Sequence, residues 1–456
     1  MLENLTEYTE RNRSRYLDEL THFLSFPSIS TDKSYKAAVI ECAEYLKSHL
    51  EGIGMQNAEV IETGGHPLVY ADWLNAGEDK PTLLIYGHYD VQPVDPVELW
   101  TTPPFKAEIR DGNIYARGAA DDKGQVFIHI KAMEAYLKNF KSLPLNVRII
   151  IEGEEEIGSP NLEPYIKNNR SKLKSDVCVI SDSAMFSEDI PALGYALRGL
   201  CYMQIDVKGP DRDLHSGQFG GAINNPINAL ASMIAKMKDD NGRILIDGFY
   251  DDVLPLTQAE LENFSRLPFD DELYARELGV TGLFGEKGYS TLERIWARPT
   301  LDCNGIIGGF TAEGAKTVLP SRASAKISMR LVPDQQPDRI AELFTQFVKK
   351  IKPEGIEVNI YGMHHSKPWI SSIESRWNQA AARALKKGFG KEPVFIREGG
   401  SIPIVNTIDT ELGIPVVLLG FGLPDENAHS PDEHLNLNNF FNGINTTIFF
   451  YNELIH

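Results

Sequence analysis

Residues 81–93 read PTLLIYGHYDVQP, an apolar run that leads straight into a histidine and an aspartate. Residues 81–86 have the length and composition of a buried β-strand. Ligands of open α/β sheets gather at the carboxyl ends of the strands. Side chains two residues apart in an extended segment point the same way, so His88 and Asp90 are predicted to face one crevice. An isolated His-x-Asp pair is nevertheless more often a turn with a hydrogen-bonded histidine.

Four further segments place acidic or histidine side chains next to the ends of predicted elements. They read RGAADDKGQ (117–125), IEGEEEIGSP (151–160), VCVISDSA (177–184) and NAHSPDEH (427–434). Taken singly, they have ordinary explanations, such as a helix cap for Asp121 and Asp122 or a solvated turn for three adjacent glutamates. Together with His88 and Asp90 they bring five such groups to one edge. Imidazole and carboxylate without thiolate predict a hydrolytic site for zinc, manganese or cobalt.

The composition of the whole chain limits its class. The 456 residues suffice for two domains, and 42% hydrophobic and 24% charged residues are ordinary for a globular protein. The net charge of −19 argues against a nucleic-acid partner, which would need a basic surface. No apolar stretch reaches the ~20 residues that span a bilayer, and residues 1–20 lack the apolar core of a signal peptide. Four cysteines without a CxxC pair predict buried, reduced thiols, so we expect a cytoplasmic protein without a membrane partner.

The hydrophobic pattern changes along the chain. Helices and apolar strands alternate in the first part and again near residues 394–421, which predicts an α/β core with a mostly parallel sheet. Between them, residues 201–207 and 325–331 alternate apolar with polar, as in an antiparallel sheet with one covered face. The segment 240–300 is acidic and irregular. We predict an α/β domain formed by residues 1–194 and 363–456. Residues 195–362 are predicted to form an α+β domain inserted into it.

Motifs of several common enzyme classes are missing from the sequence. It contains no HExxH, GxSxG, GxxxxGK or GxGxxG. The HExxH type of zinc protease, the serine hydrolases, the phosphate-loop NTPases and the dinucleotide-dependent dehydrogenases therefore lose most of their support.

As a set, GHYDVQP, RGAADDKG, EGEEEIGS, VISDS and ENAHSPDEH resemble the co-catalytic metallopeptidase family that contains carnosinase and the cytosolic nonspecific dipeptidases. The resemblance covers nearly the whole chain, and LRGLCY, DLHSGQFGG, MRLVPDQ, KPWI and REGGSIP favour the dipeptidase branch. Carboxypeptidase G, succinyl-diaminopimelate desuccinylase and acetylornithine deacetylase are more distant members. The resemblance implies a phosphorylase/hydrolase-like catalytic domain and a ferredoxin-like inserted domain that serves as lid and dimerisation domain.

The resemblance also implies a role for each residue of the site, around two divalent ions per subunit, with zinc preferred to manganese or cobalt. Glu155 resembles the general base, which takes a proton from a water shared by the ions and passes it to the leaving amine. Asp90 resembles the acid that orients His88. Glu154 has no implied role and is expected to be solvated or outside the ligand set. The implied ligands are His88, Asp121, Glu156, Asp182 and His429, with Asp121 bridging both ions and joined to Asp122 by a cis peptide bond.

Three other residues resemble substrate-binding groups. His215 resembles a histidine that reaches the active site of the partner subunit and stabilises the oxyanion, so a homodimer is implied. Arg330 resembles the arginine that clamps a substrate carboxylate, for which a bidentate guanidinium is suited. Ser401, after a Gly-Gly pair, resembles a loop that hydrogen-bonds the substrate. The alternatives are a surface histidine, a solvated strand face and a tight turn without a ligand.

The sequence therefore predicts a di-metal exopeptidase that cleaves dipeptides or small amides. An N-acyl amino acid deacylase or desuccinylase on the same scaffold would share the ions and differ in the acyl group it binds. A metal-binding protein without catalysis is a third alternative, but loss of catalysis usually removes a ligand or the base, and none is missing here. Amine release from dipeptides and from acylated amino acids separates the three.

Overall fold

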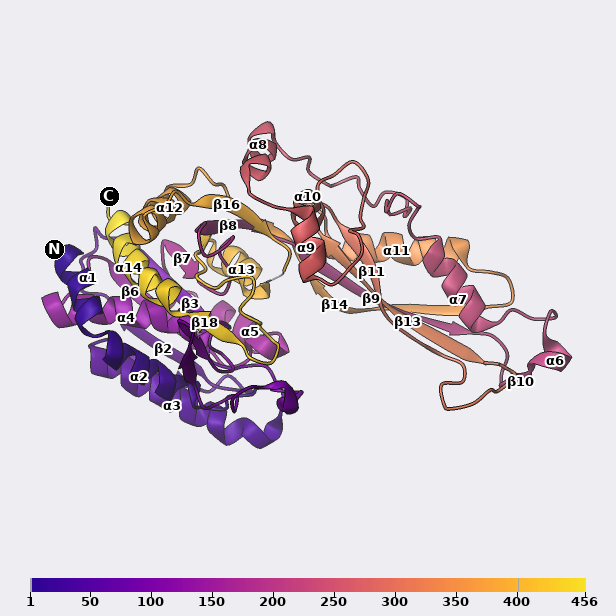
Figure 1. Cartoon of the computed structure of the whole chain (residues 1–456), viewed down its shortest axis with the longest axis horizontal. Helices are drawn as coiled ribbons and strands as arrows, with labels where there is room; N and C mark the ends of the chain where they lie inside the picture. Colours follow the sequence, from indigo (N-terminus) through magenta and orange to yellow (C-terminus); the bar gives the residue numbers. More distant parts are fainter. Residues whose placement is uncertain (1, 401) are drawn as a thin grey trace. The chain divides into compact units, whose positions relative to one another are not determined.

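The computed structural model describes residues 2–400 and 402–456. The chain forms two compact units (Figure 1). Unit 1 comprises Met1–Tyr195, Ser371–Ile396 and Ile404–His456, and unit 2 comprises Ala196–Ile370 and Arg397–Pro403.

The central sheet of unit 1 is parallel in its middle and antiparallel toward its edges. Its strand order is β1-β2-β6-β3-β7-β17-β8, and β16 also pairs with β8. The neighbours β6, β3, β7 and β17 pair in parallel, which confirms the predicted parallel arrangement for the centre. The strands are β1 (Gln56–Ile61), β2 (Leu68–Trp73), β3 (Thr82–His88), β6 (Asn146–Glu152), β7 (Val177–Ile180), β8 (Ala192–Leu197), β16 (Val394–Glu398) and β17 (Val416–Leu418).

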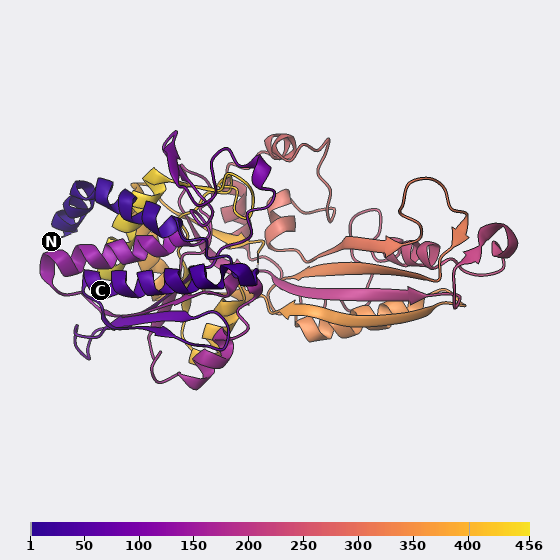
Figure 2. The same ribbon diagram turned by 90° about the horizontal axis from the view of Figure 1, so that it is seen from below.

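Helices cover one face of this sheet, with α4 between the sheet and other helices, and α5 (Leu162–Asn168) lies on the other face (Figure 2). In α4, Val126, Ile130, Met133 and Leu137 recur at helical spacing and are all buried, as expected for a helix between a sheet and other helices. The covering helices are α1 (Leu2–Arg11), α2 (Arg13–Leu24), α3 (Lys36–Ile53), α4 (Lys123–Phe140), α12 (Arg376–Phe389) and α14 (Leu437–Glu453).

Short elements connect these layers. A hairpin with its turn at Asp111-Gly112 joins β4 (Glu108–Arg110) and β5 (Asn113–Tyr115), and β5 also pairs with β18 (His434–Asn436). The other short helices of this unit are η1 (Lys33–Tyr35), η2 (Val97–Leu99), η3 (Glu155–Ile157), α13 (Pro403–Thr407) and η4 (Ile408–Leu412).

Unit 2 contains the antiparallel sheet that the alternating sequence predicted. Its order is β11-β13-β9-β14, and every second residue of β9 is buried. The buried face packs on α7 (Pro226–Ala235) and α11 (Pro337–Ile351) to form a separate core. The strands of this sheet are β9 (Gly199–Lys208), β11 (Thr300–Gly308), β13 (Arg322–Leu331) and β14 (Glu357–Ser366). The short β10 (Leu214–His215) and β12 (Val318–Leu319) pair with each other next to helix α6 (Ser216–Phe219), and the short β15 (Trp369–Ile370) pairs with β8.

The acidic segment 240–300 contains helices that the sequence analysis missed, namely α8 (Gln258–Arg266), α9 (Asp271–Glu277) and α10 (Thr291–Trp296). Capping boxes begin two of them, with Thr257 and Glu260 at α8 and Ser290 and Glu293 at α10. The pattern Thr/Ser-x-x-Glu is visible in the sequence and could have located these helix starts.

The cysteines differ in exposure. Cys42, Cys178 and Cys201 are buried, Cys303 is exposed, and all four are free. The prediction of buried thiols is wrong for Cys303 because β11 is an edge strand with most of its side chains exposed. No helix among the described residues has both the length and the apolar character that crossing a membrane requires.

Candidate active site

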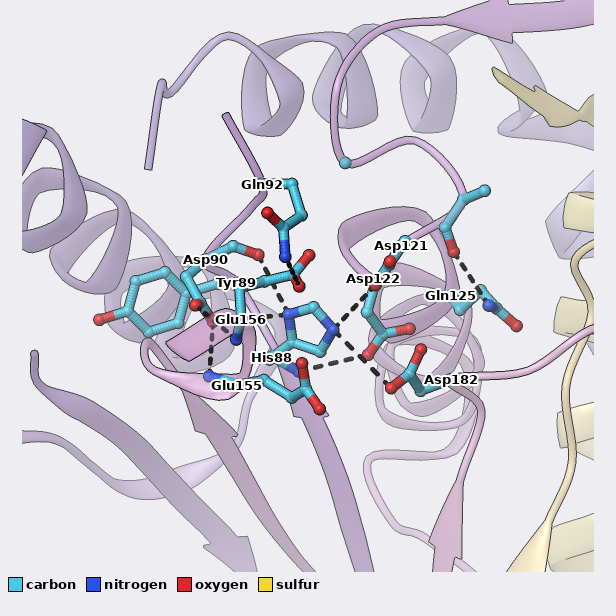
Figure 3. Close-up of polar contacts among 12 residues, drawn as sticks. His88, Tyr89, Asp90, Gln92, Asp121, Asp122, Gln125, Glu155, Glu156 and Asp182 are labelled. Atoms are coloured by element: carbon cyan, nitrogen blue, oxygen red, sulfur yellow. Dashed lines mark hydrogen bonds and ion pairs between the residues drawn. The ribbon is translucent and has the colours of Figure 1, made fainter. Parts of the chain in front are cut away.

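The ends of neighbouring parallel strands bring the predicted site residues together in unit 1 (Figure 3). His88 is the last residue of β3, and Asp182 follows β7 by two residues. Glu155 and Glu156 lie in η3, directly after β6, and His429 lies in the loop that follows β17. The carboxyl ends of parallel neighbours meet at one sheet edge, which is why residues so far apart in sequence converge.

Asp121 lies at the centre of this cluster. Its Oδ1 is 3.0 Å from Nε2 of His88, and its Oδ2 is 2.7 Å from Nε2 of His429. Asp182 Oδ2 lies 3.9 Å from the same atom of His88, and Glu156 Oε2 lies 3.4 Å from Nε2 of His429. Two ligand groups result, each with its ligand atoms within 4.8 Å of one another, and they share Asp121: His88, Asp121 and Asp182, and Asp121, Glu156 and His429.

The helix-cap explanation of Asp121 and Asp122 fails. Asp122 stands at the N-cap position of α4 but makes no capping hydrogen bond through its side chain. Its Oδ2 instead accepts the backbone N–H of His88 at 3.2 Å. The peptide bond between Asp121 and Asp122 is cis, as the family resemblance implied. Both carboxylates therefore face the end of β3.

The hydrogen bonds of His88 fix its tautomer. The Nδ1 atom lies 3.0 Å from the backbone carbonyl of Asp90 and 3.5 Å from its Oδ1. A carbonyl oxygen can only accept, so Nδ1 carries a proton and Nε2 is the nitrogen that faces Asp121 and Asp182. This Nε2 atom is buried and makes no hydrogen bond of good geometry. The ring is therefore oriented as a metal ligand would be.

Asp90 supports two segments at once. Its carbonyl is the nearer acceptor for His88, while its carboxylate accepts the backbone N–H groups of Glu155 and Glu156, each at 3.1 Å. It thus joins the end of β3 to the turn after β6. Gln92, which the sequence analysis did not single out, donates to Glu156 Oε2 at 2.7 Å. Its position in the motif GHYDVQP was the available signal.

Burial and crowding shift the acid–base properties of the cluster. Burial opposes ionisation of Asp121, but hydrogen bonds from His429 and His88 outweigh it and lower the pKa of that carboxyl. The same contacts with Asp121 and Glu156 raise the pKa of His429 to about 10. Burial, followed by repulsion from Asp121, raises the pKa of Asp182 to about 7.

Glu155 has the environment of a proton carrier. Burial raises the pKa of Glu155 well above its ordinary value, with further contributions from Asp182 and Glu156, although His88 opposes the shift. Acids outnumber histidines in the cluster, so full ionisation requires positive charge from another source. Buried Oε1 of Glu156 also lacks a hydrogen bond. The donor set of imidazoles and carboxylates, with these orphaned atoms, fits divalent ions.

Glu154 is not solvated. Its side chain is buried, and Oε1 accepts the backbone N–H of His66 at 3.0 Å. Asn161 donates its Nδ2 to both carboxylate oxygens, at 3.2 and 2.9 Å. Glu154 therefore holds the loop that contains His66 and points away from its neighbour Glu155. Glu154 therefore lies outside the ligand set, which is one of the two positions expected from the sequence. The other expectation, a solvated side chain, is wrong.

A third acidic group in the described chain already contains a cation. Glu19, His49 and Glu134 lie close enough to share an ion, but the ammonium of Lys131 lies among them. Its Nζ contacts Glu19 and lies 2.8 Å from Glu134 and 2.9 Å from Nε2 of His49. This cluster is a buried ion network between helices, with its positive charge supplied by the chain.

A cysteine-based site is also excluded in unit 2. Cys201 Sγ lies 3.7 Å from Nε2 of His365, whose Nδ1 lies 3.4 Å from Asp338. Burial, with a smaller contribution from Asp338, raises the pKa of Cys201 to about 12. The thiol is therefore protonated at neutral pH. Cys201, His365 and Asp338 follow one another as the nucleophile, base and acid of a catalytic triad would, but the triad lacks a reactive thiolate.

Two of the predicted substrate-binding residues, His215 and Arg330, belong to unit 2. Arg330 is half-buried on β13. His215 is exposed at the end of β10, where its Nδ1 accepts the backbone N–H of Gly217 at 3.0 Å. Ser401 lies outside the described residues. Their roles in substrate binding remain predictions.

The buried His129 of α4 is expected to make the stability of the fold sensitive to acid. Ser181 donates its hydroxyl to the carbonyl of Leu419, so it accepts from Nε2 of His129 at 2.7 Å. Burial lowers the pKa of His129 from 6.5 to about 3. Between these values the unfolded chain binds a proton that the folded chain does not, so stability falls as the pH falls from 6.5 toward 3.

We expect the wild type to lose about 2 kcal/mol more unfolding free energy between pH 7 and pH 5 than a His129→Gln variant, which keeps a donor but cannot titrate. Urea denaturation of both proteins at the two pH values measures the difference. Equal losses would show that His129 does not titrate in this way.

Known proteins resemble this chain over most of its length. A family model described as peptidase family M20/M25/M40 matches residues 84–451. A Cys-Gly metallodipeptidase of Schizosaccharomyces pombe is 34% identical over 469 residues, which cover 99% of this chain and 98% of the relative.

Two solved structures are similar along their whole length. The structure of human carnosine dipeptidase 1 is 30% identical, has a TM-score of 0.85 and is matched over 100% of this chain and 98% of its own. An M20 family metallo-carboxypeptidase of Sulfolobus solfataricus is 36% identical, has a TM-score of 0.85 and is matched over 96% and 99%. The resemblance identified from the sequence is confirmed.

Proposed function

Because the chain belongs to peptidase family M20/M25/M40, we propose that it is a metallopeptidase that hydrolyses the peptide bond of dipeptides. The observation that carries this proposal is the pair of ligand groups that share Asp121 beside the partly buried acid Glu155. The relatives from Schizosaccharomyces pombe and human are named as dipeptidases, and the Sulfolobus relative as a carboxypeptidase. All three names describe removal of residues from a peptide end.

Two divalent ions would be held by the shared ligand set, one by His88, Asp121 and Asp182 and the other by Asp121, Glu156 and His429. Zinc is our first choice, and manganese or cobalt would accept the same ligands. When bound, such ions polarise a carbonyl and make a nearby water more acidic. Metal content after purification, measured for all three elements, tests this assignment.

Glu155 would move the proton during hydrolysis. Burial beside Asp182 and Glu156 raises its pKa, which makes its carboxylate a better acceptor for the proton of a water, and the acid so formed can pass that proton to the leaving amine. The hydrogen bonds from the N–H groups of η3 to Asp90 fix the backbone of Glu155. Asp90 would thereby orient both the base and His88.

Unit 2 would act as a ferredoxin-like lid and dimerisation domain. We propose that it closes over the substrate, excludes water, and delivers His215 to the active site of a partner subunit in a homodimer. Activity measured on dilution, together with the mass in solution, tests this assembly. An isolated monomer with full activity would rule out the role of His215 in the partner.

Arg330 is expected to bind the substrate carboxylate, with Ser401 contacting the substrate nearby. Arg330→Lys keeps the charge but loses the two-pronged hydrogen bond, so we expect KM for a dipeptide to rise about 10–100-fold. Arg322→Lys is a matched control, because Arg322 is an exposed arginine on the same strand. Steady-state kinetics of both variants check the prediction. An unchanged KM for Arg330→Lys would contradict the proposal that Arg330 binds the substrate carboxylate.

A substrate panel tests the proposed function as a whole. Enzyme loaded with zinc or manganese is given free dipeptides, N-acetyl dipeptides, tripeptides, and N-acetyl and N-succinyl amino acids, and amine release is measured. Preference for free dipeptides supports the proposal. Preference for N-acetyl dipeptides or tripeptides indicates a carboxypeptidase, and preference for acylated amino acids indicates a deacylase.

The four free cysteines are compatible with a reducing compartment, so we also propose a cytoplasmic location. Cell fractionation with an antibody to the chain tests it.

A further inference from the structure

Glu433 is completely buried next to the site, and none of the roles above uses it. Its Oε1 accepts the backbone N–H groups of Ala120 and Asp121, at 3.0 and 3.1 Å. Its Oε2 accepts the backbone N–H of Gly118 at 2.9 Å and Nη1 of Arg117 at 2.7 Å. All four donors come from one short segment that ends at the residue shared by the two ligand groups.

The same ion pair reaches two other segments. Arg117 is 1% exposed and donates its Nη2 to the carbonyl of Pro93 at 3.0 Å. The backbone carbonyl of Glu433 accepts the N–H of Ala116 at 3.0 Å. The pair therefore joins three of the segments that carry ligands, namely residues 88–93, 117–121 and 427–434, which contain His88, Asp121 and His429.

These contacts exceed what a simple ion pair needs. Neutralising Arg117 would require one oxygen of Glu433, yet three backbone N–H groups are bound as well. Gly118 has a φ of +86°, a conformation that favours glycine, and this turns its N–H toward the carboxylate. Hydrogen bonds to a charged acceptor are stronger than neutral ones, so the path of the backbone into Asp121 is fixed.

We infer that Glu433 is a positioning residue that sets the carboxylate of Asp121 between His88 and His429. Glu433 lies four residues after His429, so one carboxylate ties the loop of this histidine to the segment of Asp121. The 2.7 Å approach of His429 Nε2 to Asp121 Oδ2 depends on this connection. The inference rests on the proposed function, because it requires that Asp121 and His429 hold a metal ion.

Zinc affinity measures this role without relying on catalysis. In Glu433→Gln, the amide nitrogen faces N–H donors whichever way the side chain turns, so the segment loses part of its anchor. We expect an affinity for Zn²⁺ about 10–100-fold below wild type, as for other residues that support metal ligands. The full-length chain is titrated with a competing chelator and the zinc retained per chain is measured, after circular dichroism has shown that the variant is folded.

Glu286→Gln is a matched control. Glu286 is also a buried glutamate, bound by Arg298 at 2.8 and 2.9 Å and by Arg243 at 3.3 Å, and these arginines lie within the segment 240–300, away from the ligand-bearing segments. We expect this variant to keep the zinc affinity of the wild type. If Glu433→Gln does not fold, Glu433→Asp replaces it, since it keeps the charge but is too short to reach all four donors.

The outcomes separate the two proposals. A wild-type chain that retains zinc, with a Glu433 variant within about twofold of its affinity, overturns the positioning role and leaves the metal centre standing. An equal loss in Glu286→Gln also overturns it, because the effect would then be general destabilisation. A wild-type chain that takes up no zinc contradicts the proposed function itself.

Discussion

Replacing Glu155 with Gln is expected to lower kcat for a dipeptide by about 10²–10⁴-fold, the range typical of a lost general base. The amide has nearly the shape of the acid but cannot take a proton from water or deliver one to the leaving amine. The backbone of Glu155 is held by Asp90 through its N–H, so the turn should keep its structure. Steady-state kinetics with metal content measured on the same sample checks the prediction.

Glu154→Gln provides the control for this experiment. Glu154 precedes Glu155 directly and is a glutamate as well, but it is buried, binds His66 and Asn161 and faces away from the ligand groups. We expect its turnover to stay within a few-fold of wild type, since the amide oxygen can still accept from the backbone. Turnover of Glu155→Gln equal to that of Glu154→Gln would exclude Glu155 as the base.

Asp121→Ala is expected to remove activity and metal together. Asp121 belongs to both ligand groups, so its loss weakens both ions at once, whereas the other ligands each belong to one. The effect should exceed the 10–100-fold typical of residues that only support a ligand. Zinc per chain and kcat/KM on a dipeptide are measured for the same preparation.

Asp72→Asn is the comparison for Asp121→Ala. Asp72 is a buried aspartate of β2 in the same unit, and it accepts hydrogen bonds from Asn57 at 2.9 Å and Tyr70 at 2.8 Å. Loss of a buried carboxylate there should affect stability without changing the metal content. If Asp121→Ala retains the zinc content of the wild type, the shared ligand assignment is wrong.

The sequence predicted the convergence of site residues because it depends on local signals. His88 and Asp182 each follow an apolar run with the length and composition of a buried strand, and parallel strands end at one edge. The parallel centre of the sheet required no information beyond the alternation of elements. The metal identity and the substrate contacts of unit 2 remain predictions, since neither follows from such patterns.

Long-range contacts and turn geometry could not be predicted. Glu433 binds a segment more than 300 residues earlier, and nothing in HSPDEH distinguishes it from a surface acid. Glu154 and Glu155 are neighbours with the same side chain, yet the turn at η3 sends one toward His66 and the other toward the ligands. Only the path of the backbone determines these roles.

The exposed thiol of Cys303 makes the native chain suitable for labelling at one site. Burial raises the pKa values of Cys42 and Cys201 to about 11 and about 12, and Cys178 is equally buried, so none offers a thiolate at neutral pH. A maleimide fluorophore should therefore attach to β11 of unit 2 without any engineered cysteine. Its emission would follow the surroundings of that strand while substrate is added, in real time and on the unmodified sequence.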